Sequence, residues 1–184
     1  MTSREPVPAA RPPAPGRRRG TVRDLAISLA VLVLPLLAVV ALCQPRDPGS
    51  TPVDPTGAYV GARAQAGFAV REPVGLDGWA ATDATFRRTP DGAATLRVGY
   101  LTPAGRYAQL VQSSVPADRL IPAELGAGRP RGVATIRGVS WQRYSARQPE
   151  DRAYVLLEPA VSVILVGDAT DDEMRTFLSS LRIR

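Results

Sequence analysis

Few of the residue types that carry enzyme chemistry occur in this chain of 184 residues. It contains no histidine and no lysine, which excludes both a Ser-His-Asp triad and a Ser-Lys dyad. The single cysteine, Cys43, ends a long apolar run and has no neighbouring base that could activate its thiol. Proton-transfer chemistry is therefore left to carboxylates.

A pair of carboxylates can hydrolyse a glycosidic bond, so the acids of the C-terminal part were considered as catalytic candidates. They are Glu124, Glu150, Asp151 and Glu158. No motif pairs them, and scattered acids are ordinarily solvated surface groups. We therefore expect no enzyme and no catalytic residue, and we retain glycan hydrolysis by carboxylates alone as the alternative function.

Neither a metal site nor a cofactor site is predicted. Metal ions need several ligands close together, and the only acidic cluster is Asp171-Asp172-Glu173. Because Thr170 precedes this cluster, we interpret it as the capping box of a helix. The segment Gly126-Ala127-Gly128 lacks the third glycine and the strand–helix context of a nucleotide-binding loop.

One segment, residues 141–144, offers a candidate binding patch. In a strand, Trp141 and Arg143 would face one side of the sheet, and Gln142 and Tyr144 the other. On an exposed face, Trp141 and Arg143 would suit a glycan or protein partner. We favour the other interpretation, in which Trp141 lies in the core and Arg143 extends its stem along apolar surface or pairs with an acid.

The positive charge of the chain is concentrated at its N-terminus. Six arginines and two acids fall in residues 1–24, whereas the whole chain carries a net charge of +6. Arginine is the only basic residue type, and no basic stripe is interleaved with aromatic residues. We therefore predict no nucleic-acid partner.

Residues 25–43 are predicted to form a transmembrane helix. These 19 residues carry no charge, and at about 1.5 Å per residue they would span roughly 28 Å, close to the hydrocarbon thickness of a bilayer. The outer flank carries only Arg46, beside Asp47, whereas four arginines crowd the N-terminal flank: Arg17, Arg18, Arg19 and Arg23. The positive-inside rule therefore places the N-terminus in the cytoplasm.

Two alternatives for this segment stay open. Val39-Val40-Ala41 has the small-residue character of a signal-peptide cleavage site, and a cysteine at position 43 is a possible lipid attachment point. A cleaved signal peptide has a shorter apolar stretch, and a lipoprotein has a small residue where Leu42 stands. We therefore prefer the spanning helix.

The remaining boundaries follow from composition. Residues 1–24 are expected to be a disordered basic cytoplasmic tail, because they are rich in proline and arginine. Residues 44–54 form a proline-rich linker. Residues 55–184 are expected to form one extracytoplasmic domain, which no internal disulfide can stabilise because it has no cysteine.

Strand and turn signals predict an α+β domain with an antiparallel sheet of about seven strands and two or three packed helices. The candidate strands 82–88, 94–101 and 107–113 are separated by short turns and predict a meander. The strongly apolar pair 152–158 and 161–167 is expected in the middle of the sheet.

Three helices complete the prediction. One begins at Pro55 and ends near Ala66, before Gly67, and a second falls within residues 114–125. A third follows the capping box, with an apolar face predicted from Met174, Phe177, Leu178 and Leu181 at positions i, i+3, i+4 and i+7.

Several short motifs also occur in a fixed order along the chain. They are RDL at 23–25, GLDGW at 75–79, ATLRVGY at 94–100, VQS at 111–113 and WQRY at 141–144. In this order they resemble an uncharacterised family of single-pass envelope proteins from actinobacteria, a domain of unknown function (number 4245). The resemblance implies location and architecture and brings no activity.

A second resemblance concerns the fold alone. Mog1/PsbP-like domains often have a strand that leads into a Gly-Trp pair, as at Gly78-Trp79, and a closing Ser-Leu-Arg segment, as at 180–182. This implies an antiparallel sheet with helices packed on its faces.

Together these observations predict a membrane-anchored, non-catalytic binding or accessory module of the cell envelope, without a cofactor. Its partners would be the lipid bilayer, through residues 25–43, and an envelope protein, wall component or lipid.

Overall fold

The computed structural model describes Val33 and residues 52–183. The chain divides into two compact units, Met1–Pro45 and Arg46–Arg184. In the first unit only Val33 is described, and it is helical. No helix within the described part of the chain is long and apolar enough to cross a membrane. The predicted tail, most of the predicted spanning segment and the linker up to residue 51 lie outside the described residues.

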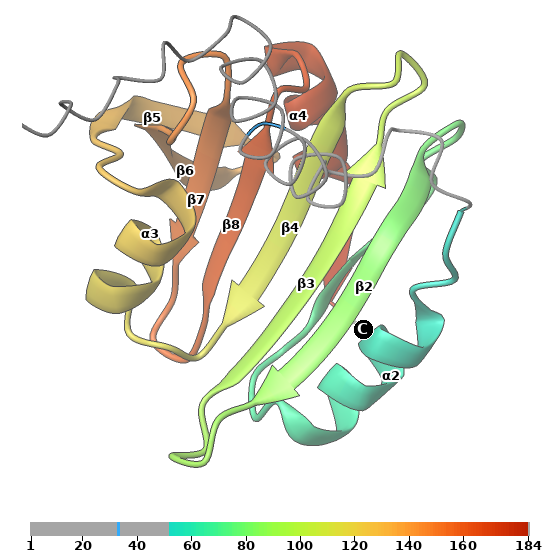
Figure 1. Cartoon of the computed structure of the whole chain (residues 1–184), viewed down its shortest axis with the longest axis vertical. Coiled ribbons are helices and arrows are strands. Elements are labelled where there is room, and N and C mark those ends of the chain that lie inside the picture. Colours follow the sequence, from blue (N-terminus) through green and yellow to red (C-terminus); the bar gives the residue numbers. More distant parts are fainter. Residues whose placement is uncertain (1–32, 34–51, 184) are drawn as a thin grey trace, which may run out of the picture. The chain divides into compact units, whose positions relative to one another are not determined.

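The second unit is an α+β domain built on a seven-stranded antiparallel sheet (Figure 1). The sheet order is β2-β3-β4-β8-β7-β6-β5. The strands are β2 (Ala80–Arg88), β3 (Ala94–Leu101), β4 (Tyr107–Ser113), β5 (Pro130–Ile136), β6 (Val139–Ser145), β7 (Arg152–Leu157) and β8 (Ser162–Gly167). The predicted fold class is thus confirmed for the domain, as are the β2-β3-β4 meander and the central positions of β7 and β8.

Three helices are described in this unit, and they divide between the two faces of the sheet (Figure 1). Helices α2 (Thr56–Gln65) and α4 (Asp171–Ser180) share the larger core cluster, to which they contribute Tyr59 and Phe177. Helix α3 (Ala117–Leu125) covers the other face with Leu120 and Leu125. Because side chains alternate along a strand, neighbouring residues of β4 serve different cores.

Helix α4 begins as the sequence predicts. The Thr170 hydroxyl accepts a hydrogen bond from the Glu173 amide at 3.3 Å, and the Glu173 carboxylate accepts one from the Thr170 amide at 2.8 Å. This reciprocal arrangement satisfies two amides that a helix start leaves free. Met174, Phe177 and Leu178 are buried on the apolar face.

The end of α4 differs from the prediction, because the helix stops at Ser180 and Leu181 belongs to a short strand, β9 (Leu181–Ile183). Strand β9 pairs with β1 (Arg71–Pro73) to form a separate two-stranded sheet. The fully buried side-chain amide of Gln112 holds β1 in place: it donates to the Arg71 carbonyl at 2.6 Å and accepts from the Arg71 amide at 2.8 Å. A strand of three residues depends on such a tertiary contact.

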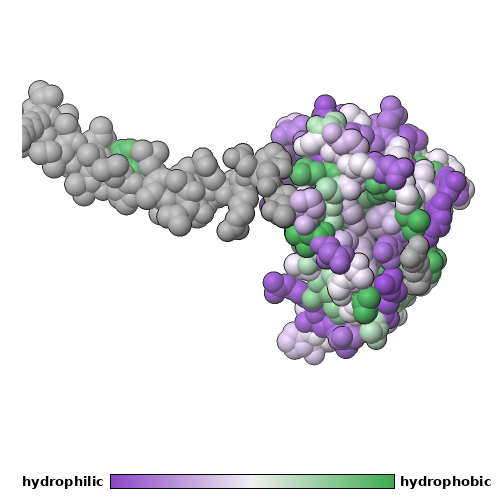
Figure 2. Space-filling model, turned by 90° about the vertical axis from the view of Figure 1, so that its right-hand side faces the viewer, coloured by the Kyte–Doolittle hydropathy of each residue, from purple (hydrophilic) through white to green (hydrophobic). Residues whose placement is uncertain are grey.

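The two edge strands of the large sheet carry its irregularities. The register shifts between Ala81 and Asp83 in β2, and between Pro130 and Gly132 in β5. On the side that carries α2 and β2, apolar side chains are interspersed among hydrophilic ones (Figure 2), which is usual on a solvated surface.

Candidate functional site

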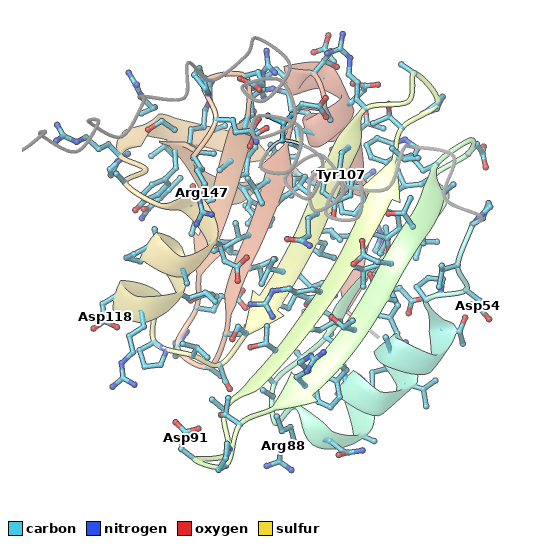
Figure 3. The ribbon with its side chains drawn as sticks, viewed as in Figure 1. Asp54, Arg88, Asp91, Tyr107, Asp118 and Arg147 are labelled. Carbon is cyan, nitrogen blue, oxygen red and sulfur yellow. The ribbon has the colours of Figure 1, made fainter. Side chains whose placement is uncertain are left out.

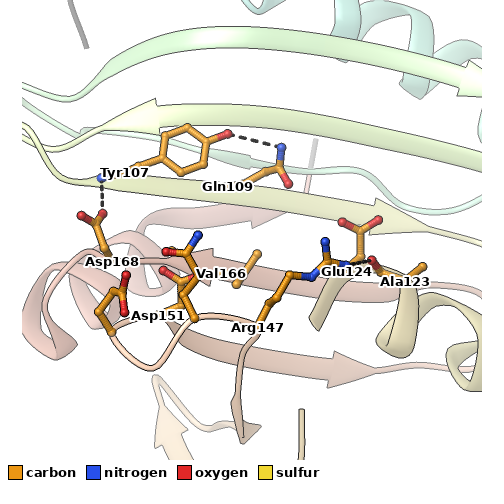
Figure 4. Close-up of a pocket in the computed structure, with 11 residues that line it drawn as sticks. Tyr107, Gln109, Ala123, Glu124, Arg147, Asp151, Val166 and Asp168 are labelled. Carbon is orange, nitrogen blue, oxygen red and sulfur yellow. Dashed lines mark hydrogen bonds between the residues drawn. The ribbon is translucent and has the colours of Figure 1, made fainter. Parts of the chain in front are cut away.

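A hollow of about 490 Å³ opens on the face of the sheet that α3 covers (Figure 4). It lies between the end of α3, the start of β4, the end of β8 and the loop that joins β6 to β7. Most of its lining residues have polar or charged side chains. The lining residues with polar side chains are Tyr107, Gln109, Glu124, Arg147, Gln148, Glu150, Asp151 and Asp168.

Tyr107 and Gln109 form the floor of this hollow from strand β4, and Figure 3 shows Tyr107 on the α3 side of the sheet. The Gln109 amide donates to the Tyr107 hydroxyl at 3.3 Å, and that hydroxyl lies 3.4 Å from the Asp83 carboxylate. Partial burial of the ring, followed by the adjacent charge of Asp83, raises the pKa of Tyr107. The phenol therefore stays protonated and can donate a hydrogen bond.

This polar floor depends on Gly99, which lies between Asp83 and Gln109 in the sheet. A Cβ atom at position 99 would come within 2.6 Å of the Tyr107 hydroxyl and closer still to the Asp83 carboxylate. The missing side chain thus provides the room in which these groups lie flat across β3.

The acids of the hollow differ in how far their carboxylates are already bound by ion pairs or hydrogen bonds. Glu124, on α3, pairs with Arg97 of β3 at 2.5 Å, and its side chain is only 11% exposed. The Asp168 carboxylate accepts the Tyr107 backbone amide at 2.6 Å. No such bond is found for the Asp151 carboxylate within the described residues, and burial raises its pKa, with repulsion from Glu150 and Asp168 adding to the effect.

Among the described residues, Arg147 is the only basic one that lines the hollow. Its guanidinium donates to the Ala123 carbonyl, near the end of α3, at 3.4 Å (Figure 4). Arginine side chains near the C-terminus of a helix complement the helix dipole. The Arg147 guanidinium is thus directed towards the helix end. Around Asp151 the electrostatic potential is negative, because the charges of Glu150 and Asp168 help to raise the pKa of Asp151.

The structure gathers three of the four acids considered in the sequence, Glu124, Glu150 and Asp151, around one hollow. The fourth, Glu158, lies elsewhere and pairs with Arg71 at 2.6 Å. The sequence analysis did not find Gln109, Arg147 and Asp168, because these residues meet only when β4 pairs with β8 and the β6–β7 loop folds over them. In the described part of the chain, no group of three or more acids or cysteines could hold a metal ion.

The other candidate residues lie away from this hollow. Trp141 is 3% exposed and belongs to the larger core, so its indole is not available as a surface patch. The Arg143 side chain is 45% exposed, and its guanidinium lies 3.7 Å from the Asp171 carboxylate. The candidate topology-setting residues lie outside the described residues: Arg17, Arg18, Arg19 and Arg23.

The domain is therefore a helix-covered antiparallel sheet with a carboxylate-rich hollow on one face. The chain belongs to the family described as protein of unknown function (DUF4245), whose family model matches residues 17–181. This confirms the family resemblance predicted from the motifs. No curated protein matches the chain.

Proposed function

We propose that this protein is a membrane-anchored, non-catalytic binding module of the cell envelope, and that its ligand site is the carboxylate-rich hollow beside α3. The anchor would be the uncharged segment 25–43, with the arginines at 17–23 holding the N-terminus inside. The domain would then present the hollow outside the membrane, at the end of a proline-rich linker.

The observation that carries the binding role is the excess of carboxylates around the hollow. Four acids and one arginine of the described chain line it, and Glu124 is the acid that Arg97 already neutralises. A ligand that brings an ammonium group would relieve the repulsion among Glu150, Asp151 and Asp168. The amide and phenol groups of Gln109 and Tyr107 add hydrogen-bonding capacity for a hydroxyl-rich ligand. The ligand class is therefore a polar, amine-bearing component of the envelope.

A matched pair of probes tests this role. Glucosamine oligosaccharides carry charged amines, whereas in their N-acetylated counterparts each amine is an uncharged amide with an added acetyl group. Titration calorimetry of both with the full chain, at low and at high salt, separates the charge contribution from that of the acetyl group. We expect binding of the amine form alone, weakened by salt. Asp151→Asn should reduce the affinity about three- to tenfold, since tenfold corresponds to about 1.4 kcal/mol. Equal binding of both probes, or no binding, would refute the proposed ligand class.

The anchor needs a separate test. Protease added to intact cells should digest the C-terminal domain of the full chain and leave a protected N-terminal fragment. Replacing Arg17, Arg18, Arg19 and Arg23 together by glutamine should reduce the fraction of chains with this orientation. A chain recovered free in the soluble fraction would contradict the anchor while leaving the hollow's binding chemistry open to the calorimetric test.

Glycan hydrolysis remains the second candidate, because the hollow gathers carboxylates and raises the pKa of Asp151, as a general acid requires. The mechanism also needs a second, free carboxylate facing the same bond. Glu124 and Asp168 are held by Arg97 and by the Tyr107 amide. The remaining acid, Glu150, is exposed and directly precedes Asp151 in the chain, and no described group holds it opposite Asp151 across a bound glycan. This arrangement favours binding without turnover. Release of reducing ends from envelope glycan by the full chain, abolished in Asp151→Asn, would establish the enzyme instead.

A further inference from the structure

A second cavity, of about 200 Å³, lies beside the C-terminal end of α4, between the β1–β9 pair and the β5–β6 hairpin. Its apolar walls include Trp141, Leu156 and Leu178. Three arginines also line it: Arg71 of β1, Arg182 of β9 and Arg137 at the hairpin turn. Within residues 52–183, no acid is among its lining residues.

Arg71 provides the first indication of a ligand. Its side chain is 13% exposed, and its Nη2 atom pairs with Glu158 at 2.6 Å. Its Nη1 atom is buried and has no hydrogen-bond partner within the described structure. A buried donor without an acceptor costs about 1–3 kcal/mol, so native proteins rarely keep one without a reason.

Arg137 provides the second indication, because its backbone adopts an unfavourable conformation. Arg137 and Gly138 have φ angles of 49° and 79°, the combination of a two-residue type I′ turn. Asparagine, aspartate or glycine usually occupies the first of these positions, where a longer side chain costs of order 1 kcal/mol. The turn places a guanidinium next to the end of α4, where it donates to the Ser179 carbonyl at 3.3 Å.

Arg182 completes the cluster. Its guanidinium donates to the same Ser179 carbonyl and to the Leu181 carbonyl, both at 2.8 Å. Each of these bonds uses Nη1, and a guanidinium has five N–H groups, so donors on both arginines remain for a further acceptor. Glu158 balances only one of the three positive charges by direct contact.

We propose that this cavity binds an anionic amphiphile, with a carboxylate or phosphate head between Arg71, Arg137 and Arg182 and a short apolar chain against Trp141 and Leu178. Arginine suits both heads because its planar group can bind two oxygens at once. The chain would replace water along apolar walls. This site lies on the α4 side of the sheet, so it is separate from the hollow beside α3 and independent of the function proposed for it.

The chain provides its own reporter. It has two tryptophans, Trp79 and Trp141, and only Trp141 lines this cavity. Trp79→Phe keeps an aromatic ring near Phe177, whose ring centroid lies 5.3 Å from that of Trp79. In the full chain with this substitution, fluorescence therefore follows Trp141. The probes are hexanoate, hexyl phosphate, hexylammonium and inorganic phosphate, all of which dissolve without forming micelles at low concentration.

We expect saturable changes in emission with hexanoate and hexyl phosphate only. Arg137→Gln and Arg182→Gln should each weaken binding about fivefold or more. Arg131→Gln removes a charge from an exposed position of β5 and serves as the matched control, since Arg131 does not line the cavity. Thermal unfolding of each variant shows whether the domain is intact, and the two arginine variants test the site independently.

Three other results of these titrations would overturn the proposed amphiphile site. Equal affinity for inorganic phosphate and hexyl phosphate would show an anion site in which the apolar walls have no role. Binding of hexylammonium as tight as that of hexanoate would exclude a role for the arginines. If Arg131→Gln weakened binding as much as Arg137→Gln does, the effect would come from general surface charge and not from the cavity.

Discussion

Arg97 of β3 lies 2.5 Å from Glu124 of α3, and this ion pair joins the open part of the sheet to the helix that covers the rest. The Glu124 side chain is 11% exposed, whereas that of Arg97 is 34% exposed. Glu124 lines the carboxylate-rich hollow, and Arg97 neutralises its charge. Because the two partners are unequally buried, their removal should have unequal effects.

Removing Arg97 should destabilise the domain more than removing the charge of Glu124. Arg97→Met leaves a poorly solvated carboxylate, which we expect to lower the free energy of unfolding by about 1–2 kcal/mol. Glu124→Gln leaves an arginine that can turn to solvent, with a cost below about 1 kcal/mol. Urea unfolding of both single variants and of the double variant measures this difference. Equal, negligible effects would indicate a screened surface pair.

Asp151→Asn should stabilise the domain at neutral pH. Burial and two acidic neighbours raise the pKa of this carboxyl above its ordinary 3.8, so its ionised form is disfavoured in the folded state. The penalty is absent below pH 3.8, grows as the pH rises through the raised pKa, and is complete above it. The gain at pH 7 should be a few tenths of a kcal/mol, because solvent screens the group.

Denaturant unfolding at pH 7 and pH 3 measures this effect. Asp77→Asn, at an exposed turn position, is the control and should show no such gain. A loss of stability in Asp151→Asn at pH 7 would mean that this carboxylate has a favourable partner.

Asp171→Asn should destabilise the domain by about 1 kcal/mol at pH 7. Asp171 begins α4 and accepts hydrogen bonds from the Tyr154 hydroxyl at 2.5 Å and from Arg175 Nε at 2.8 Å. Burial acts to raise its pKa, but these bonds and the positive charges of Arg175 and Arg143 outweigh burial, so the pKa falls below 3.8. The value of about 1 kcal/mol allows for screening, since the side chain is 37% exposed.

The pH dependence of this effect has the opposite sign to that of Asp151. Because the folded-state pKa is lowered, the contribution of Asp171 is complete above its unfolded pKa and disappears as the pH falls through the folded value. The difference between wild type and variant should stay constant from pH 7 to about pH 5 and shrink below about pH 4. Asp172→Asn, on the exposed side of the same helix turn, should change stability less.

Trp141→Ala should destabilise the domain by about 3–5 kcal/mol, because it leaves a large cavity in the core. Arg143→Ala, two residues along the same strand, should cost less than about 1 kcal/mol, since its side chain is 45% exposed and its contact with Asp171 is long. Thermal and urea unfolding compare the two. A small effect of Trp141→Ala would contradict the core position of the indole.

Local signals in the sequence are sufficient for the elements that depend on neighbouring residues. The capping box at Thr170 needs only residues three apart, and the alternation in residues 94–101 directly reflects a strand with one apolar face. The strongly apolar β7 and β8 could be placed in the middle of the sheet for the same reason. These features are encoded within a few residues of each other.

The features that the sequence analysis missed depend on distant contacts. Strands β1 and β9 are three residues long, and β1 is fixed by the side chain of Gln112, which is 41 positions from Arg71. The contact between Asp168 and the Tyr107 amide spans 61 positions. No local pattern marks such partners, so neither the second sheet nor the hollow could be predicted from spacing alone.

The two irregular edges of the large sheet bear on how copies of the domain behave when crowded. A regular edge strand offers a row of free amides and carbonyls that can pair with another chain, and so can seed aggregation. Here the shifts at Ala81–Asp83 and Pro130–Gly132 interrupt that row at both ends, and Pro130 has no amide to donate. These interruptions therefore disfavour edge-to-edge pairing between neighbouring copies of the domain.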